Sequence, residues 1–416
     1  MTKISTNTTT TNVLPMTLPV QATSSNAFEP YTTANGLRIS PAPLPSHSTD
    51  VSFGAVIEGI DVRKVTDEQF QEIRKALFEH QVVCFPNQHD LPPETQYDIT
   101  HRFDPESSTY GHGNSSNKQK NSILHPDLHT IPAVPQVQLI GHGLIQNHYG
   151  LPEARLKHPH HRTFHRDPIS AEEEKEKQIT RFYRWHIDAA LYDYNPPVVT
   201  TLSAISIPQG TQTLRYDDKS GHQMPVPLGS TVFASGYKMF DLLTDEQKKI
   251  AARTRVQYFP HAYVVIHRAR ALPNGLSMYS EGLELPKDKL PDWQEDKIKT
   301  FPLLWKNPVT GKLALQTHGC CAEKIYIDNP DGSTTIIDDL AKVREIIYDY
   351  QRPGINPERV YCHDWKEGDF VIFHNRGLIH CITGAYDDSQ TRILHQCNLA
   401  ASHPPVGPTA EEIASI

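Results

Sequence analysis

Apolar and polar positions alternate in short runs along most of this chain, which is typical of strands separated by turns. The first such run lies at residues 51–56. Thr66 and Gln69 then have the spacing of a helix capping box, and the apolar residues of 70–77 follow on one helical face. Residues 82–85 are all apolar and predict a short buried strand. The core is therefore expected to open with strand, helix and strand.

Later segments are assigned by the same criteria. Val137 and Leu139 alternate with Gln136 and Gln138, which predicts a half-buried strand. Further strands are predicted at 182–188, 198–207, 213–216, 262–266, 370–373, 378–383 and 393–399. Helices are predicted at 171–177 and over 237–258 with a break at Thr244, and a loop at 157–167. These elements predict a mainly antiparallel β core with flanking helices.

The domain organisation follows from where these patterns begin and end. Residues 1–48 are rich in Ser, Thr and Asn and predict a disordered tail. Residues 49–405 are expected to form one domain, with a large insertion at about 217–355, and residues 406–416 a C-terminal tail.

Composition narrows the class of protein. The 416 residues carry 40 basic and 48 acidic side chains, a net charge of −8, and no basic run, which argues against a nucleic-acid partner. The sequence contains neither the long apolar run of a membrane span nor a secretory signal. Its six cysteines form no CxxC pair, so we expect free thiols in a reducing compartment, the cytoplasm. We expect a small-molecule partner, and composition indicates no oligomeric state.

The chain contains His-x-Asp three times, and strand alternation would place both side chains of such a pair on one face. The pairs are His125-Asp127, His165-Asp167 and His186-Asp188. The first contains a proline and the second lies in a polar histidine cluster, so surface or packing roles are expected for both. His186-Asp188 follows a strand pattern and is the candidate metal pair.

A third ligand is expected on a neighbouring core strand. His380 lies within the apolar segment 378–383, whereas its rival His374 precedes a turn, so His380 is preferred. Two histidines and one carboxylate are a ligand set that suits non-haem Fe(II). Arg392, on the following strand, would need an anion if it is buried, and a carboxylate fits its fork. A salt bridge to an acidic side chain of the protein is the alternative.

Together these residues resemble the iron- and 2-oxoglutarate-dependent dioxygenases of the taurine dioxygenase (TauD/TfdA) family. The shared pattern is His186-x-Asp188, a long insertion, His380 and then Arg392. Thr213 lies 25 residues after Asp188, where that family places a threonine on the 2-oxoglutarate carboxylate. The runs 181–192, 305–312 and 396–402 are similar to those of the fungal xanthine dioxygenases within this family.

The resemblance implies a double-stranded β-helix, also called a jelly roll or cupin-like core. It implies Fe(II) on His186, Asp188 and His380, with 2-oxoglutarate held by Thr213 and Arg392 and O2 at the remaining position. Xanthine would be hydroxylated at C8 to uric acid, with succinate and CO2 as coproducts. Similarity to the xanthine dioxygenases also implies a purine site that includes Gln136, Gln138, Lys157, Glu174 and Asn398.

Other interpretations remain open from the residues themselves. Gln136 and Gln138 suit a purine because an amide both donates and accepts, but they could equally form a solvated strand face. An oxygenase of the same mechanism could act on an amino acid, for example by forming an aziridine from valine, and would need a second cation besides Arg392. The segment 317–322 could reshape the pocket. A metal-free binding module on the same fold is a third hypothesis.

Overall fold

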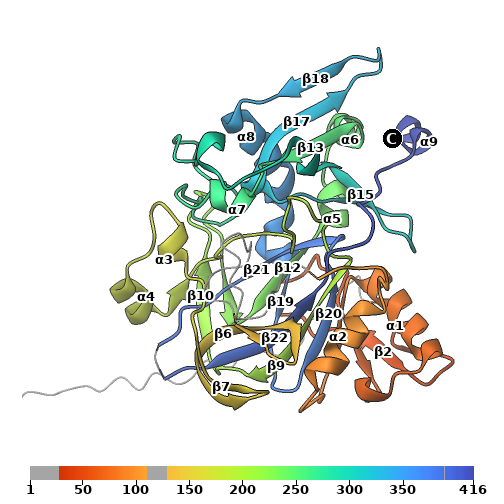
Figure 1. Ribbon diagram of the computed structural model, residues 1–416, viewed down its shortest axis with the longest axis vertical. Coiled ribbons are helices and arrows are strands. Elements are labelled where there is room, and N and C mark those ends of the chain that lie inside the picture. Colours follow the sequence, from red (N-terminus) through yellow and green to blue (C-terminus); the bar gives the residue numbers. More distant parts are fainter. Residues whose placement is uncertain (1–27, 110–128, 388) are drawn as a thin grey trace, which may run out of the picture.

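The computed structural model describes residues 28–109, 129–387 and 389–416, and its centre is two β-sheets packed face to face (Figure 1). The larger sheet has the strand order β1 (Tyr31–Thr32), β2 (Arg38–Pro41), β3 (Ala55–Glu58), β4 (Val82–Phe85), β20 (Phe370–His374), β9 (Val199–Ser206), β22 (Arg392–Asn398), β6 (Val134–His148) and β5 (His129–Ile131), with β7 (Leu151–Leu156) paired to β6. The smaller sheet consists of β19 (Val360–His363), β12 (Thr231–Ser235) and β21 (Leu378–Ile382).

One apolar cluster fills the space between the two sheets. Phe233 and Leu378 of the smaller sheet pack with Leu202, Phe373 and Leu394 of the larger one, and each is at most 5% exposed. Burying an apolar side chain of this size contributes about 1.5–3 kcal/mol. The arrangement confirms the predicted double-stranded β-helix, and the strands predicted at 82–85, 198–207, 370–373, 378–383 and 393–399 all form.

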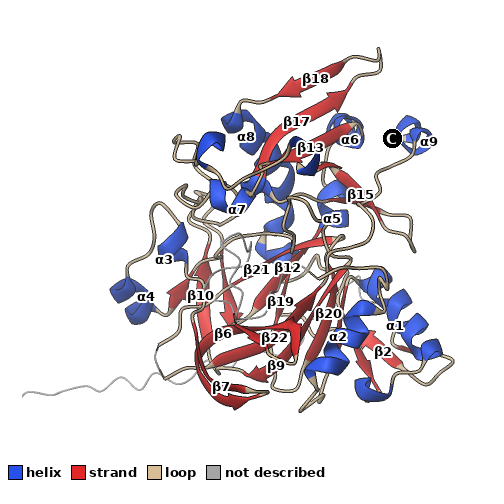
Figure 2. Cartoon of the chain, viewed as in Figure 1, coloured by secondary structure: helices blue, strands red, loops and turns tan. Residues whose placement is uncertain are grey.

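A second group of elements covers the outer face of the smaller sheet and forms the upper half of Figure 2. It comprises α5 (Gly236–Asp241), α6 (Asp245–Ala252), β13 (Thr254–Tyr258), α7 (Ala262–Val265), β14 (Thr300–Pro302), β15 (Leu304–Lys306), β16 (Leu313–Leu315), β17 (Ala322–Asp328), β18 (Thr334–Ile337) and α8 (Leu340–Gln351). Val232, Ile379 and Cys381 of the sheet pack against Met239 and Ile347 of this group. The insertion is therefore a layer packed onto the barrel.

The insertion begins later than its predicted start at residue 217. β12 is the central strand of the smaller sheet, and β11 (Gln223–Pro227) belongs to a three-stranded sheet with β10 (Thr211–Arg215) and β8 (Ile179–Thr180). The polar turn at 217–222 only joins β10 to β11 as a hairpin. The chain leaves the barrel after Ser235 and returns to it at β19.

The predicted disordered tail is wrong for residues 28–48. β1 and β2 lie there, and Leu37 and Ile39 are at most 1% exposed because they pack under α1 (Asp67–His80). The capping box is confirmed, since Thr66 accepts from the Gln69 amide and Gln69 reaches back to Thr66. α1 and α2 (Pro93–His101) flank the large sheet in Figure 1. At the other end, α9 (Ala410–Ser415) is tied to β15 by the ion pair of Lys306 and Glu412.

Four local predictions need correction. Residues 254–258 form β13 rather than a helix, because their alternating side chains pair with β14 and β17. Residues 262–266 were expected as a strand but form the short helix α7, where tertiary packing outweighs β propensity. The loop at 157–167 contains α3 (His161–Phe164). Residues 182–188 are extended but make only an isolated bridge, which the next subsection explains.

The structure tests the expected thiols and shows the lengths of the helices. All six cysteines are buried and unpaired, as expected from their spacing. Within the three described ranges, no helix is both long enough and apolar enough to cross a lipid bilayer.

Gly141 on β6 should be sensitive to a single added methyl group. Its φ is +133°, and a Cβ there would lie 1.7 Å from the Arg392 carbonyl oxygen of β22. We predict that Gly141→Ala lowers the free energy of unfolding by about 3 kcal/mol or more, since the paired strands β6 and β22 must separate. Denaturant unfolding followed by circular dichroism measures this.

Gly221→Ala is the matched control, because Gly221 has a φ of +74° with no atom within 4 Å of an added Cβ. This variant tests only the cost of placing a non-glycine residue at a positive φ, which should lower the free energy of unfolding by about 1 kcal/mol. If both variants lose the same free energy of unfolding, the close contact between Gly141 and β22 does not contribute to the effect.

Candidate active site

Three side chains from two distant segments converge at one end of the barrel interior. His186 Nε2 and His380 Nε2 lie 3.8 and 3.7 Å from Asp188 Oδ1, and the two imidazole rings are 4.1 Å apart. His380 comes from β21, and His186 and Asp188 from the extended segment before β9. Two nitrogens and one carboxylate oxygen facing a common point form a donor set that could hold a metal ion such as Fe(II).

The backbone explains how these segments meet. His186 and His380 exchange two hydrogen bonds of 2.9 Å, so they face each other as an antiparallel pair. The regular antiparallel pairing does not continue beyond this pair. The next hydrogen bond runs from Tyr183 N to Ile382 O, so the chain advances three residues from His186 but only two from His380, as in a β-bulge. Trp185 N instead bonds to Gly275 O of the insertion. This irregularity is why the predicted strand at 182–188 is reduced to one bridge.

The His186 ring is oriented by its own backbone. Its Nδ1 lies 2.9 Å from the Arg184 carbonyl oxygen, which can only accept, so Nδ1 carries the proton. Nε2 then presents a lone pair toward Asp188. A ring fixed through its second nitrogen in this way is the usual arrangement of a metal-ligating histidine.

Asp188 is held through the oxygen that faces away from the histidines. Its Oδ2 accepts from Thr200 Oγ1 at 2.6 Å and from Gln396 Nε2 at 3.3 Å, which leaves Oδ1 toward the two rings. Asn375 fixes the backbone, since its side chain bonds both the amide nitrogen and the carbonyl oxygen of Asp188 at 2.8 Å. The carboxylate is thus oriented before any ligand binds.

Burial keeps both histidines neutral. It holds the pKa of His186 well below its ordinary value, with further lowering from His380, Arg184 and His318. Burial also lowers the pKa of His380, although the Asp188 carboxylate opposes the shift. Because only the unprotonated nitrogen can bind a metal, these shifts keep the site competent at neutral pH.

Arg392 is buried, which is the condition under which its sequence position predicts an anionic partner. It is 2% exposed, and its guanidinium donates to Gly229 O at 2.9 Å and to Thr231 Oγ1 at 3.4 Å. No acidic side chain in the described part of the chain pairs with it, so the alternative of a protein salt bridge is not observed. Burial lowers its pKa, with Tyr386 acting against the shift. A buried fork with only neutral partners can receive a carboxylate.

The structure gives less support for placing the Thr213 side chain at the same site as Arg392. Leu214 beside it packs in the large apolar cluster outside the barrel, so strand alternation turns Thr213 to the opposite face of β10. The Thr213 hydroxyl makes no hydrogen bond to another described residue, and its backbone nitrogen donates to Gln178 O. Its contact with 2-oxoglutarate therefore stays a prediction.

A polar face runs across β6 and β22 next to Asp188. Gln138 lies directly opposite Gln396 in the sheet, and Asn398 lies opposite Thr200 of β9. Alternation places Arg392, Gln396 and Asn398 on the same face of β22, and both Gln138 and Asn398 are buried. Gln136, two residues before Gln138, shares that face and is half-buried. The structure therefore brings three of the five predicted purine residues to one wall beside the triad.

Glu174 and Lys157 lie elsewhere. Glu174 is 4% exposed and pairs with Arg162, while His160 Nε2 and His161 Nε2 lie 3.2 and 3.3 Å from its Oε1. The amide of Arg162 donates to His160 Nδ1, so the remaining proton of neutral His160 is on Nε2 and faces Glu174. This ion cluster fastens α3 to α4 (Ala171–Lys177). Lys157 is exposed after β7.

The rival histidines do not join the triad. His374 is 2% exposed and contacts Phe78 and Tyr237, and His165 bonds to Tyr183 O through Nε2. Both have packing roles, in line with the expectation for His165. The pair His125-Asp127 lies outside the described residues.

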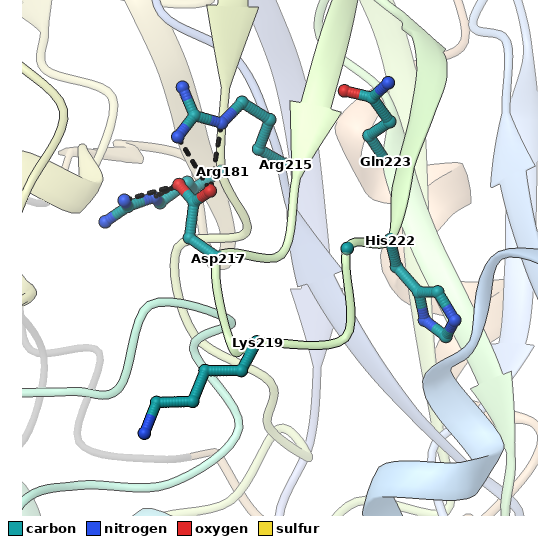
Figure 3. A pocket seen from close by; sticks show the side chains of 7 residues that line it. Arg181, Arg215, Asp217, Lys219, His222 and Gln223 are labelled. Atoms are coloured by element: carbon teal, nitrogen blue, oxygen red, sulfur yellow. Dashed lines mark hydrogen bonds and ion pairs between the residues drawn. The ribbon is translucent and has the colours of Figure 1, made fainter.

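A cavity of about 450 Å³ opens at the β10–β11 hairpin and contains none of the triad (Figure 3). Arg181 and Arg215 both turn toward Asp217, and Arg215 also bonds to Glu173. The carboxylates neutralise both arginines, so this cluster fixes the hairpin to the segment that leads into His186.

The sequence analysis missed several residues at the site. Thr200 and Gln396 could have been found, since each lies on a predicted strand, and Gln396 is four residues from Arg392 on the same face. His318 lies within the segment expected to reshape the pocket, and its ring centroid is 6.2 Å from that of His186. No pattern in the sequence places it there.

Comparison with known proteins agrees with this geometry. A family model described as "Taurine catabolism dioxygenase TauD, TfdA family" matches residues 41–398. A Schizosaccharomyces pombe protein named alpha-ketoglutarate-dependent xanthine dioxygenase xan1 is 78% identical over 98% of this chain and 99% of that protein. An Emericella nidulans protein named alpha-ketoglutarate-dependent xanthine dioxygenase xanA is 54% identical over 88% of this chain and 97% of that protein.

Among solved structures, that of AAD-2 in complex with Mn(II) and N-oxalylglycine has a similar fold. It matches with a TM-score of 0.50 and 19% identity over 89% of this chain and 99% of that chain. At this identity the likeness supports the fold alone.

The hydroxyl of Thr200 should tune metal affinity through Asp188. We predict that Thr200→Val weakens Fe(II) or Co(II) binding about 10- to 100-fold, because Oδ2 loses its shortest hydrogen bond. Equilibrium dialysis of the metal measures the effect. Thr201→Val is the control, since the Thr201 hydroxyl contacts Gln96 and Thr100 rather than Asp188. Equal metal affinity in the Thr200 variant and the wild type would disprove this role.

Proposed function

The chain belongs to the taurine catabolism dioxygenase TauD, TfdA family, and from that premise we propose that its substrate is xanthine, hydroxylated at C8 to uric acid. Membership implies Fe(II), 2-oxoglutarate and O2, so the family resemblance found in the sequence is confirmed. The observation that carries the substrate proposal is the 78% identity, over nearly the whole of both chains, to a protein named a xanthine dioxygenase.

We assign Fe(II) to His186, Asp188 and His380. The donor set of the three side chains supports this, as do the hydrogen bonds that orient His186 Nδ1 and Asp188 Oδ2 away from the common point. When bound, Fe(II) with 2-oxoglutarate and O2 supplies the oxidising power for C–H hydroxylation, with succinate and CO2 as coproducts. The protein contributes three fixed ligands and leaves the remaining positions for cosubstrate and O2.

We assign the far carboxylate of 2-oxoglutarate to Arg392, and Thr213 remains a second candidate contact. Support comes from the buried guanidinium, whose partners Gly229 O and Thr231 Oγ1 are neutral and leave its positive charge uncompensated. A charged carboxylate would supply that compensation, and a low local dielectric would strengthen the pair.

For the purine we favour the wall formed by Gln136, Gln138 and Asn398. Amide side chains can both donate and accept, which suits the alternating carbonyl and N–H groups of a purine dione. The cross-strand pairing of Gln138 with Gln396, which itself touches Asp188, supports this orientation. Lys157 and Glu174 have weaker support, since one is exposed and the other is engaged with Arg162.

The amino-acid alternative is not favoured. A second cation, the half-buried Arg184, is present, as such a substrate would need. However, the ammonium group of a zwitterion would also require an anionic partner. The carboxylate at this place is that of Asp188, which is already one of the three proposed metal ligands. A metal-free binding module is at odds with the complete ligand set. We place the protein in the cytoplasm, which its buried, unpaired cysteines support.

The reaction itself is the first test. Anaerobic protein with Fe(II), 2-oxoglutarate and xanthine should form uric acid and succinate in equal amounts when O2 is admitted, and chromatography quantifies both. Asp188→Ala should abolish turnover, because it removes the one anionic ligand. Asp167→Ala is the matched control, since Asp167 belongs to another His-x-Asp pair and is bound to Arg166. Succinate without uric acid in the wild type would refute the substrate.

Arg392 should govern the 2-oxoglutarate requirement. We predict that Arg392→Ala raises the KM for 2-oxoglutarate about 10- to 100-fold, through loss of a charge-assisted pair worth about 1.5–3 kcal/mol. Arg392→Lys keeps the charge but not the fork and should lie between. Initial rates at varied 2-oxoglutarate measure this, and an unchanged KM in the alanine variant would place the anchor at another residue.

A further inference from the structure

A group of buried polar side chains beside the triad lacks the partners that burial normally requires. Arg184 Nε and both ring nitrogens of His318 are inaccessible to solvent and make no hydrogen bond to any residue that the structure describes. An unpaired buried polar group costs about 1–3 kcal/mol. Three such atoms next to a candidate iron site indicate a place where a ligand completes the hydrogen bonds.

Arg184 extends the row of active-site side chains. Trp185 and Ile187 are at most 1% exposed and pack in the apolar cluster, so Arg184, His186 and Asp188 occupy the other side of the segment. The guanidinium carbon lies 5.0–5.5 Å from the ring centroids of Phe164, Tyr183 and Tyr263. These rings hold the cation in place, and among the described residues none accepts a hydrogen bond from its Nε.

Three other arginines that are buried or largely buried each have a carboxylate partner. Arg344 pairs with Glu284, Arg352 with Asp218 and Arg181 with Asp217, each at 2.5–2.6 Å. Arg184, which is half-buried with an inaccessible Nε, and the buried Arg392 are the two arginines at the site for which the described chain provides no carboxylate. A guanidinium stays charged in proteins, so each is suited to an anionic or strongly polar ligand atom.

His318 closes the same space from the insertion. It is fully buried, and its ring centroid lies 6.2 Å from that of His186 and 5.8 Å from that of Tyr263. Tyr263 of α7 donates its hydroxyl to Ala189 O, which fixes this wall next to Asp188. A neutral imidazole offers one donor and one acceptor, the pair of functions found on adjacent positions of a purine dione.

We propose that Arg184 and His318 form a substrate subsite that binds one carbonyl oxygen of the purine dione and the neighbouring ring N–H. The proposal rests on the proposed function, because it concerns the orientation of that substrate. It is separate from the 2-oxoglutarate anchor, since Arg392 contacts Gly229 and Thr231 while Arg184 contacts Phe164, Tyr183 and Tyr263. The guanidinium of Arg184 would donate to that oxygen and polarise its C=O bond.

The test measures xanthine binding without turnover. Protein reconstituted anaerobically with Fe(II) and 2-oxoglutarate is dialysed against labelled xanthine. We expect Arg184→Gln and His318→Leu each to weaken xanthine about 10- to 100-fold, as for loss of a charge-assisted or buried hydrogen bond. The visible absorption of the Fe(II)–2-oxoglutarate complex should be unchanged, because the anchor at Arg392 is intact. Arg181→Lys is the control, a conservative change at a buried arginine of the same segment that already has its carboxylate.

Two analogues identify the oxygen. Hypoxanthine lacks the oxygen at C2, and 2-hydroxypurine lacks the oxygen at C6. The wild type should bind one of them more weakly than xanthine, and in Arg184→Gln that difference should disappear. If Arg184→Gln loses the visible band through misfolding, Arg184→Lys and His318→Gln provide the same comparison.

The outcomes separate the two proposals. Xanthine affinity within about twofold of the wild type in both Arg184→Gln and His318→Leu, or analogue differences that persist in the variant, would overturn the subsite even if uric acid is formed. Conversely, wild-type binding that depends on Arg184 but yields no uric acid would refute the proposed function and leave the subsite standing.

Discussion

The active site depends on one pair of backbone hydrogen bonds. His186 and His380 are 194 positions apart in the chain, and the two 2.9 Å bonds between their backbones bring their side chains together at the barrel mouth. Everything else in the site is oriented relative to this pair. Thr200 and Asn375 hold Asp188, and the irregular pairing at Tyr183 prevents the segment from joining the sheet as a full strand. The segment can therefore contact the barrel on one edge and the insertion on the other.

Much of the barrel could be predicted from the sequence, because its strands bury both faces. Residues 82–85 are a continuous apolar run, residues 378–382 are apolar except for His380, and the capping box at Thr66 and Gln69 fixes where α1 begins. The errors lie where tertiary contacts decide the conformation. Residues 262–265 have strand-like composition but form a helix in the insertion, and Leu37 and Ile39 are isolated apolar residues in a polar stretch whose burial depends on α1. Local pattern carries no information about such partners.

The residues of the site also fall into those that the sequence predicts and those that depend on tertiary contacts. Strand alternation relates Gln396 and Asn398, and Arg392 lies on the strand that follows His380, where a buried arginine needs an anion, so these positions follow from the sequence. The wall at His318 and Tyr263 does not, because it forms only when the insertion folds back over the segment at Arg184. Side chains brought together by a long connection have no fixed separation in the sequence. The family resemblance was needed to propose that Arg392 binds the cosubstrate and that Gln138 and Asn398 contact the substrate.

The layered construction has an evolutionary consequence. The proposed iron ligands and Arg392, the proposed cosubstrate anchor, lie on strands and on the segment bridged to them, where a change of register would damage both sheets at once. His318 and Tyr263 come from the outer layer, which contacts the barrel mainly through apolar packing. Recombination or drift in that layer could therefore generate paralogues with new selectivity while the oxidative machinery is inherited intact.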